Sequence, residues 1–497
     1  MAPQETLYRS LVRDTTAYLA FILLITTIGP LQFGFHLAEL NAPQDVITCK
    51  KESIGAYDKD VKLPQCIDMN TDQFAVVSSI YTLGGLLGAL ASGPCCNKYG
   101  RLITMRLISL FLVIGPAFES SASNIGLLSF GRVISGVGAG AAIVVVPIYI
   151  SEIAPPKEKG LFGAFTQVMI NMGILIAQLL GYFLSRGNLW RIILGTAGII
   201  SLTQLLALFL VPESPKWLAE HRKPQLARKI LRKIRGHRVD LDEEVKAWNV
   251  DSSEQDIEEE ETLLEASAGT HPTSNPKAAK ASIGILGAFL EPQYRPAVIA
   301  VIAVMLAQQL TGINSIMMYS VSLLSELLPT TAALLTVAVS ALNVIITTVC
   351  APLSDKIGRK PCIMLSIAGM GTSSIMLALG IYYSVRVLST IATLTFVASF
   401  GVGLGPVPFI LANELVGPEA VGATQSWALA ANWIATFLVS QFFPILNKRL
   451  GRGRVYYVFA GFAVLFAGFI AWWVPETKGK HGAEEVWGRK EARERVE

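Results

Sequence analysis

Amide side chains stand inside long apolar stretches of this sequence, where a polar group that faces lipid is costly. An amide both donates and accepts hydrogen bonds, so a cluster of amides suits an uncharged ligand that carries hydroxyl groups. A single amide in such a stretch is more often a bond between helices than a ligand contact. Six amides over four stretches favour a ligand site instead. They are Gln167, Gln308, Gln309, Asn314, Asn343 and Asn432.

Two ionisable residues, His36 and Arg132, also lie inside apolar stretches. An ionisable group at such a place is a functional hypothesis by default. A histidine titrates near about pH 6.5 unless its surroundings shift it. A neighbouring Arg132 would disfavour the protonated ring, whereas Glu39, three residues after the histidine, would favour it. Two interpretations stay open: a neutral histidine that makes hydrogen bonds, and a proton-sensitive group in an acidic compartment.

The composition identifies the elements that must position these residues. Of 497 residues, 52% are hydrophobic and 16% are charged, and the mean hydropathy is +0.49. Soluble chains have about 25% charged residues, so a soluble enzyme, a disordered protein and a nucleic-acid binder are excluded. A membrane span needs about 20 apolar residues and must be helical, because lipid offers the backbone no partner. The predicted spans are 17–38, 72–96, 102–122, 126–151, 160–184, 189–211, 297–327, 331–354, 361–383, 387–415, 420–446 and 455–474.

These spans predict an all-α membrane protein with two six-helix lobes. The predicted segments are an N-terminus at 1–16, lobes at 17–211 and 297–474, a central segment at 212–296 and a tail at 475–497. Lys and Arg are more frequent on the side of the termini, even without the central segment, which favours cytosolic termini. Within that segment, residues 214–248 have the basic amphipathic pattern of short helices on the cytosolic face. Residues 249–280 are acidic and then rich in Ser, Thr and Pro, which predicts a disordered linker.

Short motifs recur between the two lobes. Asn97–Arg101 corresponds to Asp355–Arg359, Glu152 to Glu414, and Pro212–Pro215 to Pro475–Lys478, at separations of 258, 262 and 263 positions. Three pairs at nearly one separation indicate that the lobes are related copies. Transporters are often built from such repeats, with the substrate held between them near the middle of the membrane. Glycine and proline interruptions at this depth, at Thr311–Gly312 and in Gly403–Pro408, should loosen the seventh and tenth helices and indicate the binding and gating region.

Longer runs of residues carry a family resemblance. They are Gln32–Phe35, Asn41–Gln44, Gly131–Arg132, Pro147–Pro155, Pro212–Leu218, Gln308–Asn314, Leu353–Lys360 and Pro475–Gly479. On these runs the chain resembles the sugar porters of the major facilitator superfamily, which include the animal glucose facilitators and the fungal hexose carriers. The resemblance implies a carrier that moves a monosaccharide by alternating access. It implies no enzyme activity, no cofactor, no metal and no nucleic acid, and a monomer is the expected form.

The resemblance also implies roles for individual residues. The six amides and Phe409 match sugar-contacting positions of the family. His36 stands where proton-coupled relatives carry aspartate, near the arginine that Arg132 matches. Three positions depart from the glucose-binding pattern, and at two of them Gly401 replaces a carboxylate or amide and Thr436 replaces a further amide. Phe409 itself replaces a larger indole. Glucose as the preferred substrate is therefore in doubt, and fructose, another hexose or a polyol remain open.

A second set of family positions implies a gate at the cytosolic ends of the helices. Its residues are Asn97, Arg101, Glu152, Lys159, Asp355, Arg359 and Glu414. In the family these positions clamp the lobes together when the outside is open. This chain has Leu102, Lys159 and Val421 where arginine is usual, and neither Leu nor Val offers a donor while Lys lacks the planar fork. The clamp is thinned, which predicts an inward-facing or occluded resting state.

Several alternatives remain open at this stage. Transport can be facilitated diffusion or proton-linked symport, and the substrate can be a polyol. A sugar sensor on the same scaffold is disfavoured, because only 18 residues follow Gly479. Cys49 and Cys66 share one predicted loop, where a disulfide and two free thiols are equally expected. The six cysteines lack metal-ligand spacing. The plasma membrane and the vacuolar membrane are both compatible with the sequence.

Overall fold

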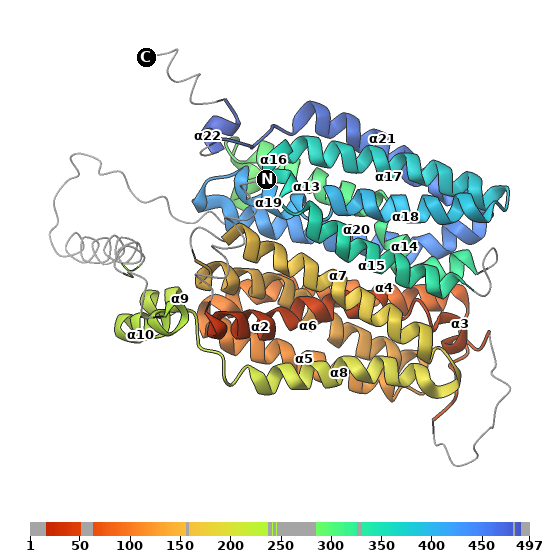
Figure 1. Ribbon diagram of the computed structural model, residues 1–497, viewed down its shortest axis with the longest axis horizontal. Coiled ribbons are helices and arrows are strands. Elements are labelled where there is room, and N and C mark those ends of the chain that lie inside the picture. Colours follow the sequence, from red (N-terminus) through yellow and green to blue (C-terminus); the bar gives the residue numbers. More distant parts are fainter. Residues whose placement is uncertain are drawn as a thin grey trace.

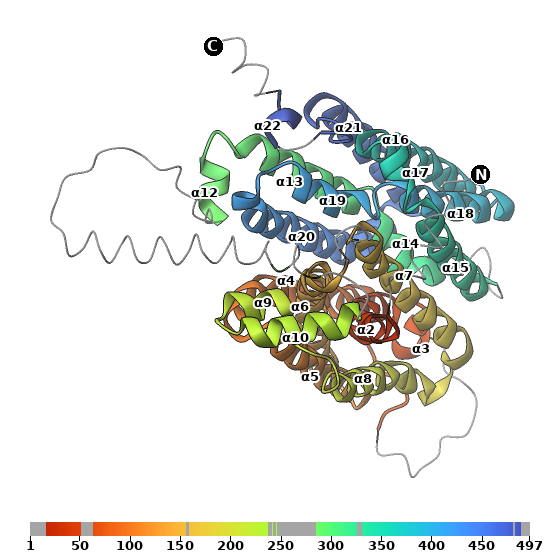
Figure 2. The same cartoon turned by 60° about the vertical axis from the view of Figure 1, so that its left-hand side comes forward.

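The computed structural model describes residues 16–50, 63–155, 159–236, 241, 245, 285–325, 331–480 and 483–488. Within these residues, twelve helical segments are long and apolar enough to cross a membrane, as the sequence predicted. Figures 1 and 2 show them as two bundles that lie side by side, one from each half of the chain. The predicted acidic linker at 249–280 lies outside the described residues.

Six helices form the N-terminal lobe. They are α2 (Ala17–Ala38), α4 (Thr71–Tyr99), α5 (Arg101–Ser120), α6 (Ile125–Ile153), α7 (Lys159–Leu184) and α8 (Trp190–Ala207), the last preceded by the short helix η2 (Gly187–Leu189). A short helix α3 (Gln44–Ile47) lies at one end of this lobe, and α9 (Pro215–Glu220) and α10 (Pro224–Arg235) lie at the opposite end (Figure 1). We name the two ends of the molecule the α3 end and the α10 end.

The C-terminal lobe repeats the arrangement with two broken helices. Its elements are α13 (Arg295–Leu310), α14 (Ile313–Leu324), α15 (Ala332–Cys350), α16 (Leu353–Ile357), α17 (Arg359–Tyr382), α18 (Arg386–Val402), α19 (Val407–Glu414), α20 (Pro418–Leu450) and α21 (Val455–Trp473). The seventh span breaks between α13 and α14 at Thr311–Gly312, and the tenth breaks between α18 and α19 at Gly403–Pro406. Both predicted interruptions are confirmed.

The central segment contains one helix that the sequence reading missed. Helices α9 and α10 fall inside the predicted basic region, but α12 (Ile285–Leu290) follows the predicted linker, where the sequence pattern predicts no helix. Its six residues are too few for a span, so an apolar run of this length did not stand out from the next span. Phe289 packs on Trp427 with ring centroids 5.3 Å apart, and Ala288 is fully buried against Val298 and Ala423. This contact docks α12 against α13 and α20.

At the α3 end, a disulfide joins Cys49 to Cys66 across a loop of the N-terminal lobe, which decides between the two open expectations. The residues between them that precede Leu63 lie outside the described part of the chain. Trp190, the first residue of α8, donates from its indole N–H to the carbonyl of Gln65 at 2.8 Å. The disulfide and this bond together attach the loop to the lobe.

Two half-buried glutamates cap corresponding helices at the α10 end. The Glu213 carboxylate accepts the backbone N–H groups of Arg101 and Leu102, the first residues of α5, at 3.0 Å each. The Glu476 carboxylate accepts those of Arg359 and Lys360, at 2.9 and 3.0 Å. The first N–H groups of a helix have no partner within the helix, and a carboxylate supplies one. The repeated Pro-Glu pairs are therefore the helix caps of the two lobes.

The glycine before each capped helix makes room for the carboxylate. Gly100 has φ +93° and Gly358 has φ +117°, a region that favours glycine. A Cβ at Gly100 would lie 2.5 Å from Glu213, and one at Gly358 would lie 2.7 Å from Glu476. Burial raises the pKa of Glu213, and its bonds to backbone N–H groups oppose that rise.

Glu213→Ala is expected to destabilise the N-terminal lobe by about 1–3 kcal/mol, because it leaves buried N–H groups of α5 without an acceptor. Thermal unfolding of the purified chain in detergent measures the loss. Glu220→Ala is the matched control, since Glu220 makes only a half-exposed ion pair with Lys216 at 3.8 Å. Equal melting temperatures for the two variants would show that the cap contributes nothing.

Candidate functional site

Four of the predicted amides form one connected cluster in the C-terminal lobe. Gln308, near the end of α13, donates to the carbonyls of Leu404 and Gly405 at 2.6 and 3.2 Å, so it bridges the two helix breaks. Its side-chain oxygen accepts from Asn432 of α20 at 2.5 Å. Asn314 of α14 donates to the Gln309 oxygen at 2.6 Å. The cluster contains only neutral groups, and it lies where both broken helices meet α20.

The other two predicted amides lie at a separate place, where the lobes meet. Asn171 of α7 joins them: it accepts from Asn343 of α15 at 3.2 Å and from Gln167 at 3.4 Å. Asn171 also donates to Thr347 of α15 at 2.8 Å, so this group binds one lobe to the other. The sequence reading did not select Asn171 or Gln178, although both are amides in the fifth span and would have met the criterion used for Gln167.

The three positions that depart from the glucose-binding pattern have distinct surroundings. A Cβ at Gly401 would lie 3.0 Å from the Ile346 side chain and 3.3 Å from the Thr347 hydroxyl, so α15 occupies the space beside it. The Thr436 hydroxyl donates to the Asn432 carbonyl at 2.8 Å, within its own helix. Phe409 is half-buried on α19 and packs against the main core.

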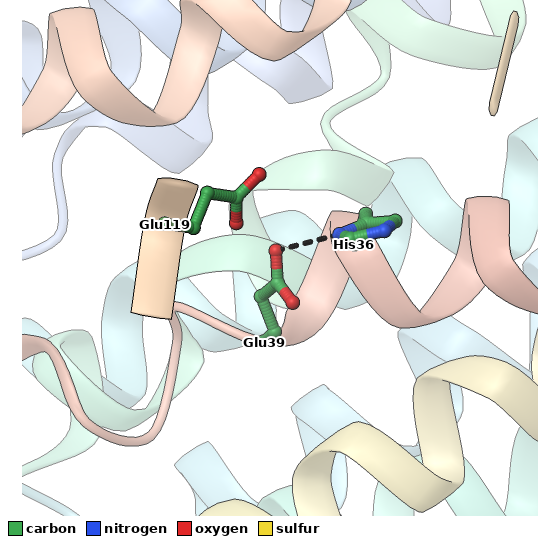
Figure 3. Close-up of side chains that lie close together, drawn as sticks. All are labelled: His36, Glu39 and Glu119. Carbon is green, nitrogen blue, oxygen red and sulfur yellow. Dashed lines mark hydrogen bonds and ion pairs between the residues drawn. The ribbon is translucent and has the colours of Figure 1, made fainter. Parts of the chain in front are cut away.

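His36 and Arg132 belong to a fully buried cluster near the α3 end. Figure 3 shows His36, Glu39 and Glu119 turned toward one another. The His36 Nδ1 and a Glu39 oxygen lie 2.8 Å apart, and Arg132 forms an ion pair with that same oxygen. Arg132 also donates to the His36 carbonyl at 3.0 Å, and it lies 4.0 Å from Glu119. All four residues have 0% exposure.

The sequence reading noted Glu39 only as a neighbour of His36 and missed Glu119. Glu119 lies one residue before the end of α5, so it resembled an ordinary charge at a membrane surface. The packing contradicts that appearance, because a Cβ at Gly131 of α6 would lie 2.6 Å from its side chain. The sequence did contain one signal for this burial, because Glu119 is an acidic residue inside the predicted span 102–122.

Polar bonds join the lobes near the α3 end. Asn41 donates to the Met317 carbonyl and to the Ser320 hydroxyl, both at 3.0 Å, and accepts from the Val321 N–H at 3.1 Å. Ser79 of α4 donates to Gln441 of α20 at 2.6 Å. The α3 end of the molecule is therefore closed.

Aromatic packing lies further in along the same interface. Trp433 of α20 meets Phe33 and Tyr81 of the other lobe, with ring centroids 5.5 and 6.3 Å apart. These aromatic contacts extend the closed part of the interface inward from the α3 end.

The predicted gating residues lie at the α10 end but pair within their own lobes. Arg101 and Glu152 form a bidentate ion pair with a shortest contact of 2.6 Å. Arg359 contacts Glu414 at 2.8 Å and Asp355 at 2.9 Å. A clamp between the lobes would require a conformation in which the α10 end is closed. The gating role of these residues therefore stays a prediction.

Three further positions of this predicted gate have other surroundings. The Asn97 carbonyl accepts from the Trp217 indole at 3.0 Å. Val421 is half-buried against the main core, while Glu414 is already bonded by Arg359 and by Thr477, whose hydroxyl donates at 2.5 Å. Glu414 therefore has partners in this conformation even though Val421 offers no donor. The side chain of Lys159 lies outside the described part of the structure.

Comparison with known proteins gives a consistent result over nearly the whole chain. The profile of the family described as "Sugar (and other) transporter" matches residues 22–486. A probable metabolite transport protein of Saccharomyces cerevisiae is 34% identical over 482 residues, which cover 95% of each chain. The human facilitated glucose transporter member 3 of solute carrier family 2 is 30% identical over 480 residues, covering 94% of this chain and 91% of that protein.

Solved structures support the same fold. The xylose transporter XylE from E. coli, in a partially occluded inward open conformation, superposes with a TM-score of 0.74 at 24% identity. The match covers 94% of this chain and 100% of that one. The fold and the site thus define a transporter of the major facilitator superfamily. The chain belongs to the sugar transporter family, and it is an integral, multi-pass membrane protein that transports sugar and is not an enzyme.

Proposed function

We propose that this chain carries a hexose down its concentration gradient by facilitated diffusion. The observation that carries the proposal is the neutral amide cluster of Gln308, Gln309, Asn314 and Asn432, which lies where both broken helices meet α20. Neutral amides match the hydroxyl groups of a monosaccharide without attracting a charged solute. Gln167 and Asn343 extend the proposed site to the place where the lobes meet, and Phe409 offers an apolar surface.

Sugars other than glucose are the favoured substrates. The space beside Gly401 is bounded by Ile346 and Thr347, so α15 stands where relatives that bind glucose carry a polar group. The Thr436 hydroxyl is bonded within α20 and is less available to a ligand than an amide would be. A site that lacks a partner for one substrate hydroxyl discriminates strongly against sugars that need it. Fructose, another hexose and a polyol are the candidates that follow.

In this proposal the α10 end faces the cytosol, and the membrane is the plasma membrane or the vacuolar membrane. Basic residues are more frequent on the side of the termini, which supports that orientation. A Saccharomyces cerevisiae relative named vacuolar protein sorting-associated protein 73 is 31% identical over 475 residues, which supports the vacuolar alternative. The residues that we propose as a cytosolic gate are Asn97, Arg101, Glu152, Lys159, Asp355, Arg359 and Glu414.

Proton-linked symport is the second candidate, because His36 and Arg132 occupy the coupling positions and solved relatives include a proton:xylose symporter. We expect downhill transport without obligatory proton movement, since histidine replaces the aspartate of proton-linked relatives. The experiment uses the purified chain in vesicles that contain a pH indicator, a panel of labelled sugars, and two external pH values. Uptake of one hexose without a change of internal pH is the expected result. Sugar-driven acidification of the vesicle interior that His36→Asn abolishes would instead establish symport.

A further inference from the structure

Two carboxylates share one arginine in the buried cluster of the N-terminal lobe. One ligand atom from each of His36, Glu39 and Glu119 lies within 4.8 Å of the other two. Arg132 is the one guanidinium or ammonium group within ion-pair distance of either carboxylate in the described part of the chain. With a neutral His36, two ionised carboxylates and Arg132 leave one surplus negative charge. Burial makes that surplus costly, because neither water nor a second cation offsets it.

The hydrogen bonds leave one oxygen of each carboxylate without a partner. The Glu39 Oε1 atom receives both Arg132 and His36 Nδ1. The Glu119 Oε1 atom accepts the Ser135 hydroxyl at 2.6 Å. The Oε2 atoms of Glu39 and Glu119 are buried and make no hydrogen bond. A proton on one Oε2 atom would remove the surplus charge and convert that atom into a donor.

The helices packed around the pair supply no second positive charge. On α4, the Tyr81 ring lies under the Arg132 guanidinium at 4.5 Å, and its hydroxyl donates to the Phe33 carbonyl at 3.2 Å. On α8, Arg191 is directed to the carbonyls of Ser120 and Ala122, just beyond Glu119. On α7, Asn171 and Gln178 bond to the C-terminal lobe, and both are neutral amides. The charge balance of the pair therefore depends on Arg132, His36 and bound protons.

The same cluster is joined to the closed interface at the α3 end. Asn41, two residues after Glu39, makes three hydrogen bonds to α14 of the other lobe. Tyr81, which covers Arg132, also packs on Trp433 of α20. Opening this end must separate Asn41 from α14 and bring water toward Glu39. Water stabilises a second ionised carboxylate, whereas the closed state, with 0% exposure of Glu39 and Glu119, favours a neutral one.

We propose that Glu39 and Glu119 form a proton-binding site in which one of the two carboxyl groups holds a single proton on its Oε2 atom, and that this proton holds the α3 end closed. On opening, that O–H bond transfers its proton to water, and both carboxylates ionise. The proton leaves and returns on the α3 side, so the site regulates transport without carrying a proton across the membrane. A divalent cation fits less well than a proton, because two positive charges would exceed the one surplus negative charge beside Arg132. The inference rests on the proposed function only for the alternating opening of this end.

The direct test is infrared spectroscopy of the full-length chain in nanodiscs, without sugar, over about pH 4–9. We expect the carbonyl band of a protonated carboxyl group that disappears as the pH rises. Glu119→Gln should remove the pH-dependent band, and so should Glu39→Gln. His36→Asn should retain it, as should the control Glu213→Gln, whose carboxylate is bonded to backbone N–H groups at the other end of the molecule. Loss of the band in His36→Asn alone would overturn the assignment to the pair.

A second measurement tests the conformational effect with a cysteine at Ser78, which is 2% exposed near the α3 end. Its labelling by a membrane-impermeant reagent added on the α3 side should rise with pH, by up to about tenfold per pH unit for one proton. Glu119→Gln should label slowly at every pH, because its neutral amide imitates the protonated acid. Labelling that remains pH-dependent in this variant would overturn the proposal. A chain that moves no hexose but shows the titrating band would refute only the proposed function.

Discussion

Replacing Gln308 by alanine is expected to abolish measurable sugar uptake while the chain still folds. Gln308 connects the broken tenth span, through the carbonyls of Leu404 and Gly405, to Asn432 of α20. Its loss removes four hydrogen bonds, one of them from Gln309, and leaves the Asn432 amide without this partner. Each such loss costs about 1–3 kcal/mol, so uptake should fall by about 100-fold or more. Asn314→Ala should act in the same direction, because Asn314 is bonded to the adjacent Gln309.

Gln204→Ala is the matched control for these variants. Gln204 is also a buried glutamine, but its one side-chain bond, to the Ile25 carbonyl at 3.2 Å, joins α8 to α2 away from the cluster. Uptake of labelled hexose into cells that lack their own hexose transport measures activity. Surface delivery and the melting temperature of each variant report folding. Near-normal uptake by both Gln308→Ala and Asn314→Ala would show that the substrate binds elsewhere.

The helices could be predicted from sequence because lipid imposes one length scale and one secondary structure. Each predicted span overlaps an observed one, and the limits differ by a few residues at most ends. The helix breaks were also predictable, because Gly and Pro directly cause the loss of backbone hydrogen bonds within a helix. By contrast, α12 was missed because a six-residue apolar helix has no such length signal.

The binding site was less predictable, because amides reveal a polar interior but not their partners. The sequence grouped Gln167 and Asn343 with the cluster around Gln308, whereas in the structure both bond to Asn171 instead. Glu119 was invisible for a related reason. Its position near a helix end predicts exposure, and only the packing of α5 on α6 buries it. Contacts between helices decide such cases, and one sequence does not contain them.

The closed α3 end leads to the second large effect, for Asn41→Ala. Asn41 is the residue with three hydrogen bonds to the opposite lobe, and alanine would leave the Val321 N–H and the Met317 carbonyl without these partners. Two conformations of a carrier differ by only a few kcal/mol. Removing about 1–3 kcal/mol from the closed form should therefore shift the population toward an opened α3 end by about 5–150-fold.

Side-specific labelling measures this shift, again with a cysteine at Ser78 as the reporter. Asn41→Ala should raise the labelling rate from the α3 side and slow sugar exchange, since closing becomes the difficult step. Asn70→Ala is the control at the same end: Asn70 accepts only from Gln73 within its own lobe, as the cap of α4. The predicted inward-facing resting state depends on this result. If Asn41→Ala and Asn70→Ala label at the same rate, the bonds from Asn41 do not hold the end closed. The other contacts between the lobes at this end, the Ser79–Gln441 bond and the packing of Trp433 on Phe33 and Tyr81, would then carry the preference.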